Sequence, residues 1–267
     1  MSILNKDFKI KQEGNLRTLE IYLYGDIQGD YYNFWGDKVE SKTSANYVKN
    51  ALDKAGKVDN INIYIDSLGG SVEEGNAIFN LLKRADAVKT VYIDAFAFSV
   101  ASVIAMAGDK IIMPSNSTMM IHNAMMEAYG TSEDLRKAAT ALETMNEGSC
   151  NTYLVKAGQK LTKEKLKELL NAETFLTAEQ ALEIGLCDEI ANPVDLSQSA
   201  EVAEQAKKQN NPTAKKAIEV IQSYKLSSSG GKPEENPPEG KPEQNQDKFD
   251  WLSEFVNKNN IFKGELK

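Results

Sequence analysis

One apolar stretch, residues 95–108 (AFAFSVASVIAMAG), constrains the fold of this chain more than any other part of the sequence. It is shorter than the roughly 20 residues that a bilayer-spanning helix needs, and Asp94 and Asp109 bound it. The stretch must therefore be buried inside the protein. Small residues such as Ala97 and Ser99 crowd its middle, and small side chains let neighbouring backbone approach closely. We therefore expect a tightly packed corner of the fold here.

The composition of the 267-residue chain excludes several classes of protein. A hydrophobic fraction of 41% is enough to bury a sizeable core, so we expect roughly one to two domains. The net charge of -8 gives no field that would attract nucleic acid or an anionic membrane. Cys150 and Cys187 form no CxxC motif and only one histidine accompanies them, so we expect neither a metal nor a cofactor. Residues 1–11 do not resemble a secretory signal, which favours a cytoplasmic location.

The first half of the chain alternates between strand and helix patterns. The expected strands are residues 18–24, 61–65 and 88–95, and the expected helices are residues 44–54, 71–84 and 99–107. Ser71 and Glu74 predict a capping box at the start of the second helix, and Gly56 ends the first. This alternation is typical of an α/β fold in which helices pack on a largely parallel sheet.

The second half of the chain continues this pattern and then changes character. Further elements are expected as short strands at residues 110–113 and 118–121, a long helix at 131–155, a capped helix from Thr177 to before Gly185, and a closing strand at 186–190. Residues 196–226 predict a polar, partly helical extension, and residues 227–247 predict a disordered linker because they contain no large apolar side chain. Residues 248–267 contain a short amphipathic segment that is too small to fold alone.

Ser99, His122 and the pair Gly69-Gly70 are the residues most suited to hydrolytic chemistry. A serine hydroxyl is a weak nucleophile until a base takes its proton, and the negative charge that then develops needs backbone amides. His122 is the only histidine of the chain and follows a predicted strand, while a glycine turn that opens a helix leaves N–H groups facing outward. Taken singly, each feature also fits an ordinary structural role in a core, a bend or a tight turn.

The order and spacing of these motifs resemble the Clp protease family. The sequence contains DSLGGSVEEGNAIFN, then AFAFSVASVIAMAG, then MMIHN, and His122 follows Ser99 by 23 residues. The resemblance covers roughly residues 18–190. It implies that Ser99 is the nucleophile, that His122 is the general base, and that the amides of Gly70 and Val100 form the oxyanion hole.

The resemblance also implies a third catalytic residue, Glu173, within the string AETFLTAEQ. Bacterial housekeeping Clp peptidases have aspartate at this position, but a carboxylate near the imidazole N–H is what the chemistry requires. The nearby acids Glu168 and Asp188 stay open as alternatives. The string Glu-Thr-aromatic and the upstream element at residues 35–37 (WGD) resemble the phage-encoded head maturation (prohead) proteases.

Four positions near the predicted site affect how we expect it to work. Phe96 and Phe98 stand where the family has glycine and small residues, so we expect them to reshape the substrate pocket. Leu68 replaces the family's proline before the glycines, which predicts a less rigid turn. Ser102 lies three positions after Ser99, faces roughly the same side on this reading, and competes with it for the role of nucleophile.

The resemblance thus implies a peptidase domain at residues 1–195 with a ClpP/crotonase-like fold of repeated β-β-α or β-α units. A protruding handle helix is expected within residues 127–156.

The implied function is that of a serine endopeptidase and phage head maturation protease, which cuts scaffold or capsid precursors in the host cytoplasm or the assembling prohead. A homo-oligomer is implied, as a heptameric or stacked ring. The alternatives are a housekeeping Clp peptidase subunit that works with an ATPase, and a non-catalytic Clp-like assembly component. The C-terminal residues 227–267 either dock a partner or form a solvated appendage.

Overall fold

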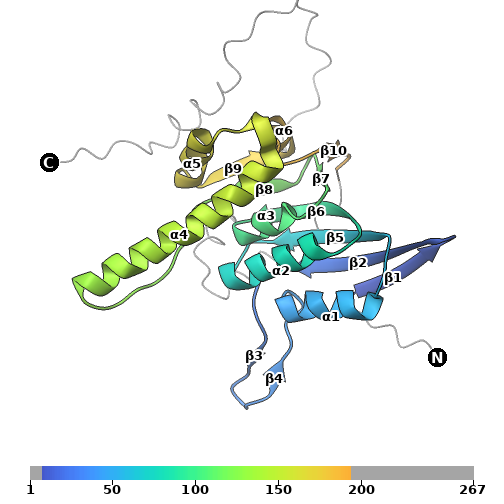
Figure 1. The fold of residues 1–267 in the computed structure, drawn as a ribbon, viewed down its shortest axis with the longest axis horizontal. Coiled ribbons are helices and arrows are strands. Elements are labelled where there is room, and N and C mark those ends of the chain that lie inside the picture. Colours follow the sequence, from blue (N-terminus) through green and yellow to red (C-terminus); the bar gives the residue numbers. More distant parts are fainter. Residues whose placement is uncertain (1–7, 194–267) are drawn as a thin grey trace, which may run out of the picture. The chain divides into compact units, whose positions relative to one another are not determined.

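A mostly parallel β-sheet organises the protein in this computed structural model, which describes residues 8–193 (Figure 1). The strands are β1 (Phe8–Glu13), β2 (Leu16–Tyr24), β5 (Asn60–Ser67), β6 (Val88–Phe98), β7 (Lys110–Pro114), β8 (Thr118–Ile121), β9 (Thr174–Thr177) and β10 (Glu189–Ala191). They lie in the order β1-β2-β5-β6-β7-β10, with β8 beside the end of β6 and β9 beside β8. Only the pairs β1–β2 and β8–β9 of this described sheet are antiparallel. The predicted α/β fold is confirmed.

Three helices pack next to one another on one face of this sheet (Figure 1). They are α1 (Ala45–Ala55), α2 (Val72–Arg84) and α3 (Val100–Ala105), and the later helices are α4 (Ser132–Ala157), η1 (Gly158–Lys160), α5 (Lys163–Asn171) and α6 (Ala178–Glu183). The sheet residues that alternate toward α1–α3, such as Ile21, Ile63 and Val91, are fully buried. Burial of these side chains on one face holds strands and helices together because it removes a continuous apolar surface from water.

The expected capping box at the start of α2 is only half formed. The Ser71 side chain accepts a hydrogen bond from the Glu74 N–H, as predicted. The Ser71 N–H, however, donates to the Ile27 carbonyl, so the Glu74 carboxylate is not needed there. Instead Glu74 accepts from the N–H of Ala45 at 2.6 Å. That N–H is one of the first of α1, which have no partner within their own helix, so Glu74 joins the starts of two helices.

Other differences from the sequence-based expectations concern boundaries and short elements. The closing strand begins at Glu189 rather than at residue 186, because the N–H groups of Leu186 and Cys187 both bond the Ala181 carbonyl in a turn after α6. The sequence patterns did not predict β1, α5, β9, or the two-stranded hairpin of β3 (Tyr31–Tyr32) and β4 (Lys38–Val39). The second capped helix is α6, and Thr177 and Gln180 form its full capping box.

The long predicted helix is α4, which projects from the rest of the fold (Figure 1). Its start is fixed by a capping box between Thr131 and Asp134. The buried residues of α4 are Cys150, Tyr153 and Ala157, all in its last third. The predicted handle is therefore helical from residue 132, and only its C-terminal end packs on the body of the fold.

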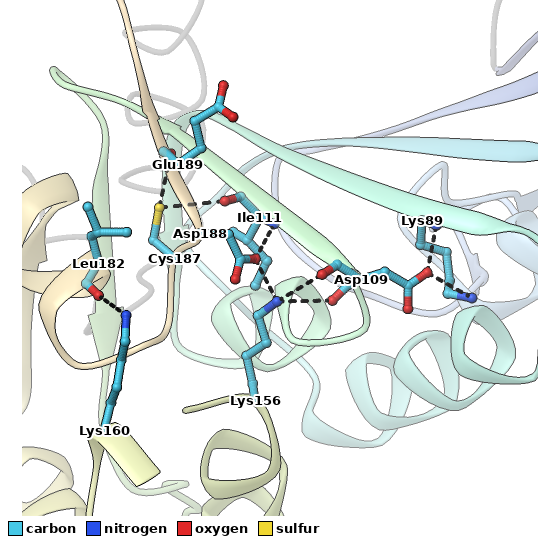
Figure 2. Close-up of polar contacts among 10 residues, drawn as sticks. Lys89, Asp109, Ile111, Lys156, Lys160, Leu182, Cys187, Asp188 and Glu189 are labelled. Atoms are coloured by element: carbon cyan, nitrogen blue, oxygen red, sulfur yellow. Dashed lines mark hydrogen bonds and ion pairs between the residues drawn. The ribbon is translucent and has the colours of Figure 1, made fainter. Parts of the chain in front are cut away.

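The C-terminal end of α4 is held by Lys156 (Figure 2). Its ammonium group lies 2.6 Å from the Asp188 carboxylate and donates to the carbonyls of Gly108 and Asp109 at 3.4 and 3.3 Å. The same Asp188 oxygen accepts from the N–H of Ile111 at 2.7 Å, where β7 begins. One largely buried cation thus ties α4 to the turn after α3 and to the start of β10.

We expect Lys156→Met to lower the free energy of unfolding by about 1–3 kcal/mol, because two carbonyls and a carboxylate lose their charged donor. The urea unfolding midpoint measures this effect. Lys137→Met is the matched control, since Lys137 lies on the exposed part of the same helix, and its expected effect is within about 0.5 kcal/mol. Equal midpoints for the two variants would contradict the role given to Lys156.

The predictions for residues 196–226, 227–247 and 248–267 lie outside the described residues. Within residues 8–193, no helix has both the length and the apolar character needed to cross a bilayer. The apolar stretch at residues 95–108 is buried as expected, with Ser99 as its one half-buried member.

Candidate active site

Ser99 occupies the junction between β6 and α3, in a backbone conformation that is unusual for serine. Its φ is 54° and its ψ is -130°, whereas side chains other than glycine rarely adopt a positive φ. Such a residue costs about 1–3 kcal/mol and persists only where its surroundings hold it. Here the Ser99 N–H donates to the Met120 carbonyl at 2.9 Å, and the Ser99 carbonyl accepts from the Ser102 N–H at 3.0 Å. The fold therefore maintains a sharp turn that presents the Ser99 side chain between a strand and a helix.

His122 faces this serine across the ends of two parallel strands. In the pairing of β6 with β8, Phe98 lies opposite Met120, so the residues that follow these strands meet at the same edge of the sheet. The His122 Nε2 atom is 2.7 Å from the Ser99 Oγ atom. His122 is 9% exposed, while Ser99 is half-buried. With Nε2 unprotonated, this contact is a hydrogen bond that allows His122 to take the serine proton.

The turn Gly69-Gly70 is pinned against Ser99 and Ile27. The Ile27 N–H donates to the Gly69 carbonyl at 2.8 Å, and Gly70 and Ile27 form a parallel bridge. A Cβ atom at Gly69 would lie 2.6 Å from the Ser99 Cβ atom, and one at Gly70 would lie 2.2 Å from the Ile27 carbonyl oxygen. Both glycines have positive φ, at 96° and 144°. The close approach and the backbone conformation together require glycine at both positions.

The backbone N–H groups of Gly70 and Val100 belong to the residues that directly follow Gly69 and Ser99, which contact each other. Val100 begins α3, so its N–H has no carbonyl partner within the helix. Gly70 follows Gly69, whose own N–H donates to the Ser67 side chain at 3.1 Å. A Cβ atom at Gly69 would lie 3.1 Å from the Ser99 Oγ atom, so the residues that carry these two amides are direct neighbours of residues at the serine hydroxyl. Amides so placed could stabilise a negative charge that develops beside Ser99.

Glu173 directly precedes β9, just as His122 directly follows the antiparallel strand β8. The last pair of these two strands is Ile121 with Thr174, so His122 and Glu173 are the residues next to that pair. Glu173 is half-buried and has a φ of 50°, and its N–H donates to the Leu170 carbonyl at 3.2 Å.

The two alternative acids are engaged elsewhere in the fold. Asp188 accepts from the Ile111 N–H and pairs with Lys156. Glu168 pairs with Lys165 at 3.1 Å, and its side chain is 66% exposed. Both of these carboxylates are therefore held by partners other than His122.

Ser102 does not point toward the same side as the reactive hydroxyl, contrary to the sequence-based expectation. It is fully buried, its Oγ atom lies 2.6 Å from the Ser99 carbonyl oxygen, and the same atom lies 2.6 Å from the Tyr153 hydroxyl. Because the α3 turn directs it into the core, Ser102 cannot meet a substrate. No sequence pattern singles out Tyr153, because a tyrosine on an amphipathic helix indicates core packing and nothing more.

The residues near Ser99 that depart from the family pattern, Phe96, Phe98 and Leu68, are buried in the core. Phe98 is fully buried and its ring packs edge-on against Phe175 with centroids 5.3 Å apart, while Phe96 is 6% exposed. Neither ring is open to solvent in the described fold, so the expectation that they reshape the pocket gains no support. Leu68 is also fully buried, and the turn that follows it is held by hydrogen bonds to Ile27 in place of a rigid proline.

Comparison with known proteins identifies the family to which this chain belongs. The sequence profile of the Clp protease family matches residues 20–194. An "ATP-dependent Clp protease proteolytic subunit" of Deinococcus radiodurans is 30% identical over 173 residues, which cover 63% of this chain and 83% of the relative. A protein of the same description from Ligilactobacillus salivarius is 32% identical over 142 residues, which cover 52% of this chain and 71% of the relative. The chain therefore belongs to the Clp protease family.

Proposed function

We propose that this protein is a serine endopeptidase in which Ser99 is the nucleophile and His122 the general base. The observation that carries this proposal is the distance of 2.7 Å between His122 Nε2 and Ser99 Oγ. As Ser99 Oγ attacks the carbonyl carbon of a peptide bond, its proton passes to His122 Nε2. The carbonyl oxygen becomes an oxyanion and accepts hydrogen bonds from the N–H groups of Gly70 and Val100.

His122 then returns its proton to the leaving amine, the C–N bond breaks, and an acyl group stays on Ser99. A water molecule, deprotonated by His122, attacks this ester, and the same two amides hold the second oxyanion. The bond between Ser99 Oγ and the acyl carbon then breaks, the carboxylic acid leaves, and His122 returns its proton to Ser99 Oγ. Glu173 orients the imidazole and stabilises its positive charge during both steps. Hydrolysis of an unstructured peptide by the wild type, and its loss in Ser99→Ala at unchanged secondary structure, tests the proposal. Equal rates for the two proteins would contradict it.

The role given to Glu173 predicts a large loss of turnover when its charge is removed. We expect Glu173→Gln to lower kcat by roughly 10²–10⁴-fold, because the amide neither fixes the productive tautomer nor stabilises the imidazolium. Glu173→Asp is the matched control, and it should keep most of the activity since it retains a carboxylate. Steady-state peptide hydrolysis measures both variants. If Glu173→Gln hydrolyses peptide as fast as the wild type, another group orients His122.

For the biological role, we propose processing of scaffold or capsid precursors during phage head maturation. This rests on the resemblance of the string that begins at Glu173 and of the WGD element at residues 35–37. The names of the two relatives favour the alternative, a peptidase subunit that works with an ATPase. Incubation with a capsid precursor alone, and with an unfoldase, ATP and a folded substrate, separates the roles. Cleavage of the precursor without ATP supports head maturation, whereas cleavage only with unfoldase and ATP supports the alternative.

We also propose that the protein works as a homo-oligomer, in a ring as the family resemblance implies. Helix α4 projects from the fold and exposes apolar side chains, among them Met145 at 43% and Val155 at 80% exposure. Exposed apolar groups on a projecting element favour self-association. Light scattering should give a mass several times that of one chain. A monomeric mass at micromolar concentration would contradict the ring.

A further inference from the structure

We propose that Ser102 and Tyr153 are positioning residues that orient the oxyanion-binding N–H of Val100. This inference rests on the proposed peptidase function and adds two residues to it. The two side chains form a buried chain of hydroxyl groups that ends on the Ser99 carbonyl oxygen. That oxygen belongs to the same peptide unit as the Val100 N–H. A contact that fixes the orientation of the Ser99 carbonyl group therefore also fixes the orientation of the Val100 N–H.

The direction of the hydrogen bonds that Ser102 makes with Ser99 and Tyr153 follows from counting the available protons. Ser102 Oγ lies 2.6 Å from the Ser99 carbonyl oxygen, which can only accept, so Ser102 donates its one proton there. The contact of 2.6 Å between Ser102 Oγ and the Tyr153 hydroxyl must then be a donation by tyrosine. Burial raises the pKa of Tyr153, against a weaker opposite effect of its bond to Ser102, so the phenol keeps the proton that it donates.

The geometry of the peptide group carries this constraint to the active site. The Ser99 carbonyl accepts twice, from the Ser102 N–H at 3.0 Å and from the Ser102 hydroxyl at 2.6 Å. The peptide bond is planar and trans, so its N–H points away from its carbonyl oxygen. Two donors on the inner side therefore hold the Val100 N–H facing outward, beside Ser99 Oγ. Hydrogen bonds to the carbonyl also polarise the peptide and strengthen its N–H as a donor.

Two further observations support a specific role for the hydrogen-bonded hydroxyl groups of Ser102 and Tyr153. Ser99 has a φ of 54°, a conformation that needs external contacts to persist. Tyr153 is 1% exposed and lies in the last third of α4, which is the part of the projecting helix that packs on the body. The hydroxyl chain thus links the base of α4 to the nucleophile turn. A shift of α4 would act directly on the orientation of the Val100 N–H.

The test measures kcat, KM and the affinity for a peptide boronate, whose tetrahedral adduct places an oxygen in the oxyanion hole. We expect Ser102→Ala to lower kcat roughly 10- to 100-fold with little change in KM, and to weaken boronate binding by the same factor. Tyr153→Phe should act in the same direction but less, because Ser102 can still donate. Ser117→Ala is the matched control: Ser117 is another buried serine that donates to the carbonyl three residues earlier, that of Pro114, at 2.8 Å.

The double variant Ser102→Ala/Tyr153→Phe separates positioning from stability. Ser102→Ala alone leaves the Tyr153 hydroxyl buried without its acceptor, whereas the double variant removes both partners. We expect its unfolding midpoint to recover toward that of the wild type while kcat stays as low as in Ser102→Ala. Recovery of kcat together with stability, or a wild-type kcat in Ser102→Ala, would overturn the inference and leave the peptidase proposal intact. A wild-type protein without peptidase activity would overturn both.

Discussion

Replacing His122 with alanine is expected to lower kcat for peptide hydrolysis by roughly 10⁴–10⁶-fold. The reason is that Ser99 then has no base within reach, and the chain contains no other histidine that could take its place. Without that base the hydroxyl stays protonated near neutral pH and is a weak nucleophile. Single-turnover acylation with an activated ester substrate measures the loss on the step that involves the base.

A double variant controls this first prediction. Residues that act as one unit lose activity together, so Ser99→Ala/His122→Ala should be no slower than either single variant. If the second substitution slowed the reaction by a further large factor, Ser99 and His122 would act independently. That result would contradict a mechanism based on proton transfer between them.

The second large effect is expected for Gly69→Ala, which should lower kcat/KM by at least roughly 100-fold. A methyl group at this position would lie 2.6 Å from the Ser99 Cβ atom and 2.9 Å from the Phe98 carbonyl oxygen. Neither neighbour can move without shifting the nucleophile turn, and a displacement of about 1 Å is enough for a loss of that size. Activity and the thermal unfolding temperature should be measured on the same preparation.

Gly14→Ala is the matched control for the glycine substitution. Gly14 also has a positive φ, at 61°, but a Cβ atom there would meet nothing within 4 Å. It therefore carries the backbone strain of such a substitution without the contact at the active site, and its kcat/KM should equal that of the wild type. Similar activity for Gly69→Ala and Gly14→Ala would mean that the close approach of the turn to Ser99 has no catalytic consequence.

The parts of the fold that could be predicted are those with strong local patterns. The strands β2, β5 and β6 and the helices α1, α2 and α4 all lie where periodicity and capping residues placed them. Strand β1 was missed because five of its six residues are exposed and it has little apolar alternation. Helix α5 did carry a signal, since Thr162 caps it and Leu166, Leu169 and Leu170 recur at helical spacing on its buried face.

Only those residues of the candidate site that lie in local sequence motifs could be predicted. Ser99, His122 and the glycine pair lie in recognisable strings, and the structure brings Ser99 and His122 into contact. Glu173 and His122 adjoin the last pair of β8 and β9, so their proximity depends on the pairing of two short strands that lie more than 50 residues apart in the sequence. The bond between Ser102 and Tyr153 likewise joins positions 51 residues apart. No local pattern encodes such a pairing, because it arises from the packing of α4 against α3.

The most direct test of the central claim is reaction with a fluorophosphonate probe, followed by mass spectrometry of the labelled peptide. A phosphonyl group attached to Ser99 is the predicted result, with the label absent in Ser99→Ala and His122→Ala and present, though formed more slowly, in Ser102→Ala. A label that survives Ser99→Ala, or a protein that the probe does not modify at all, would contradict the assignment of Ser99 as an activated nucleophile.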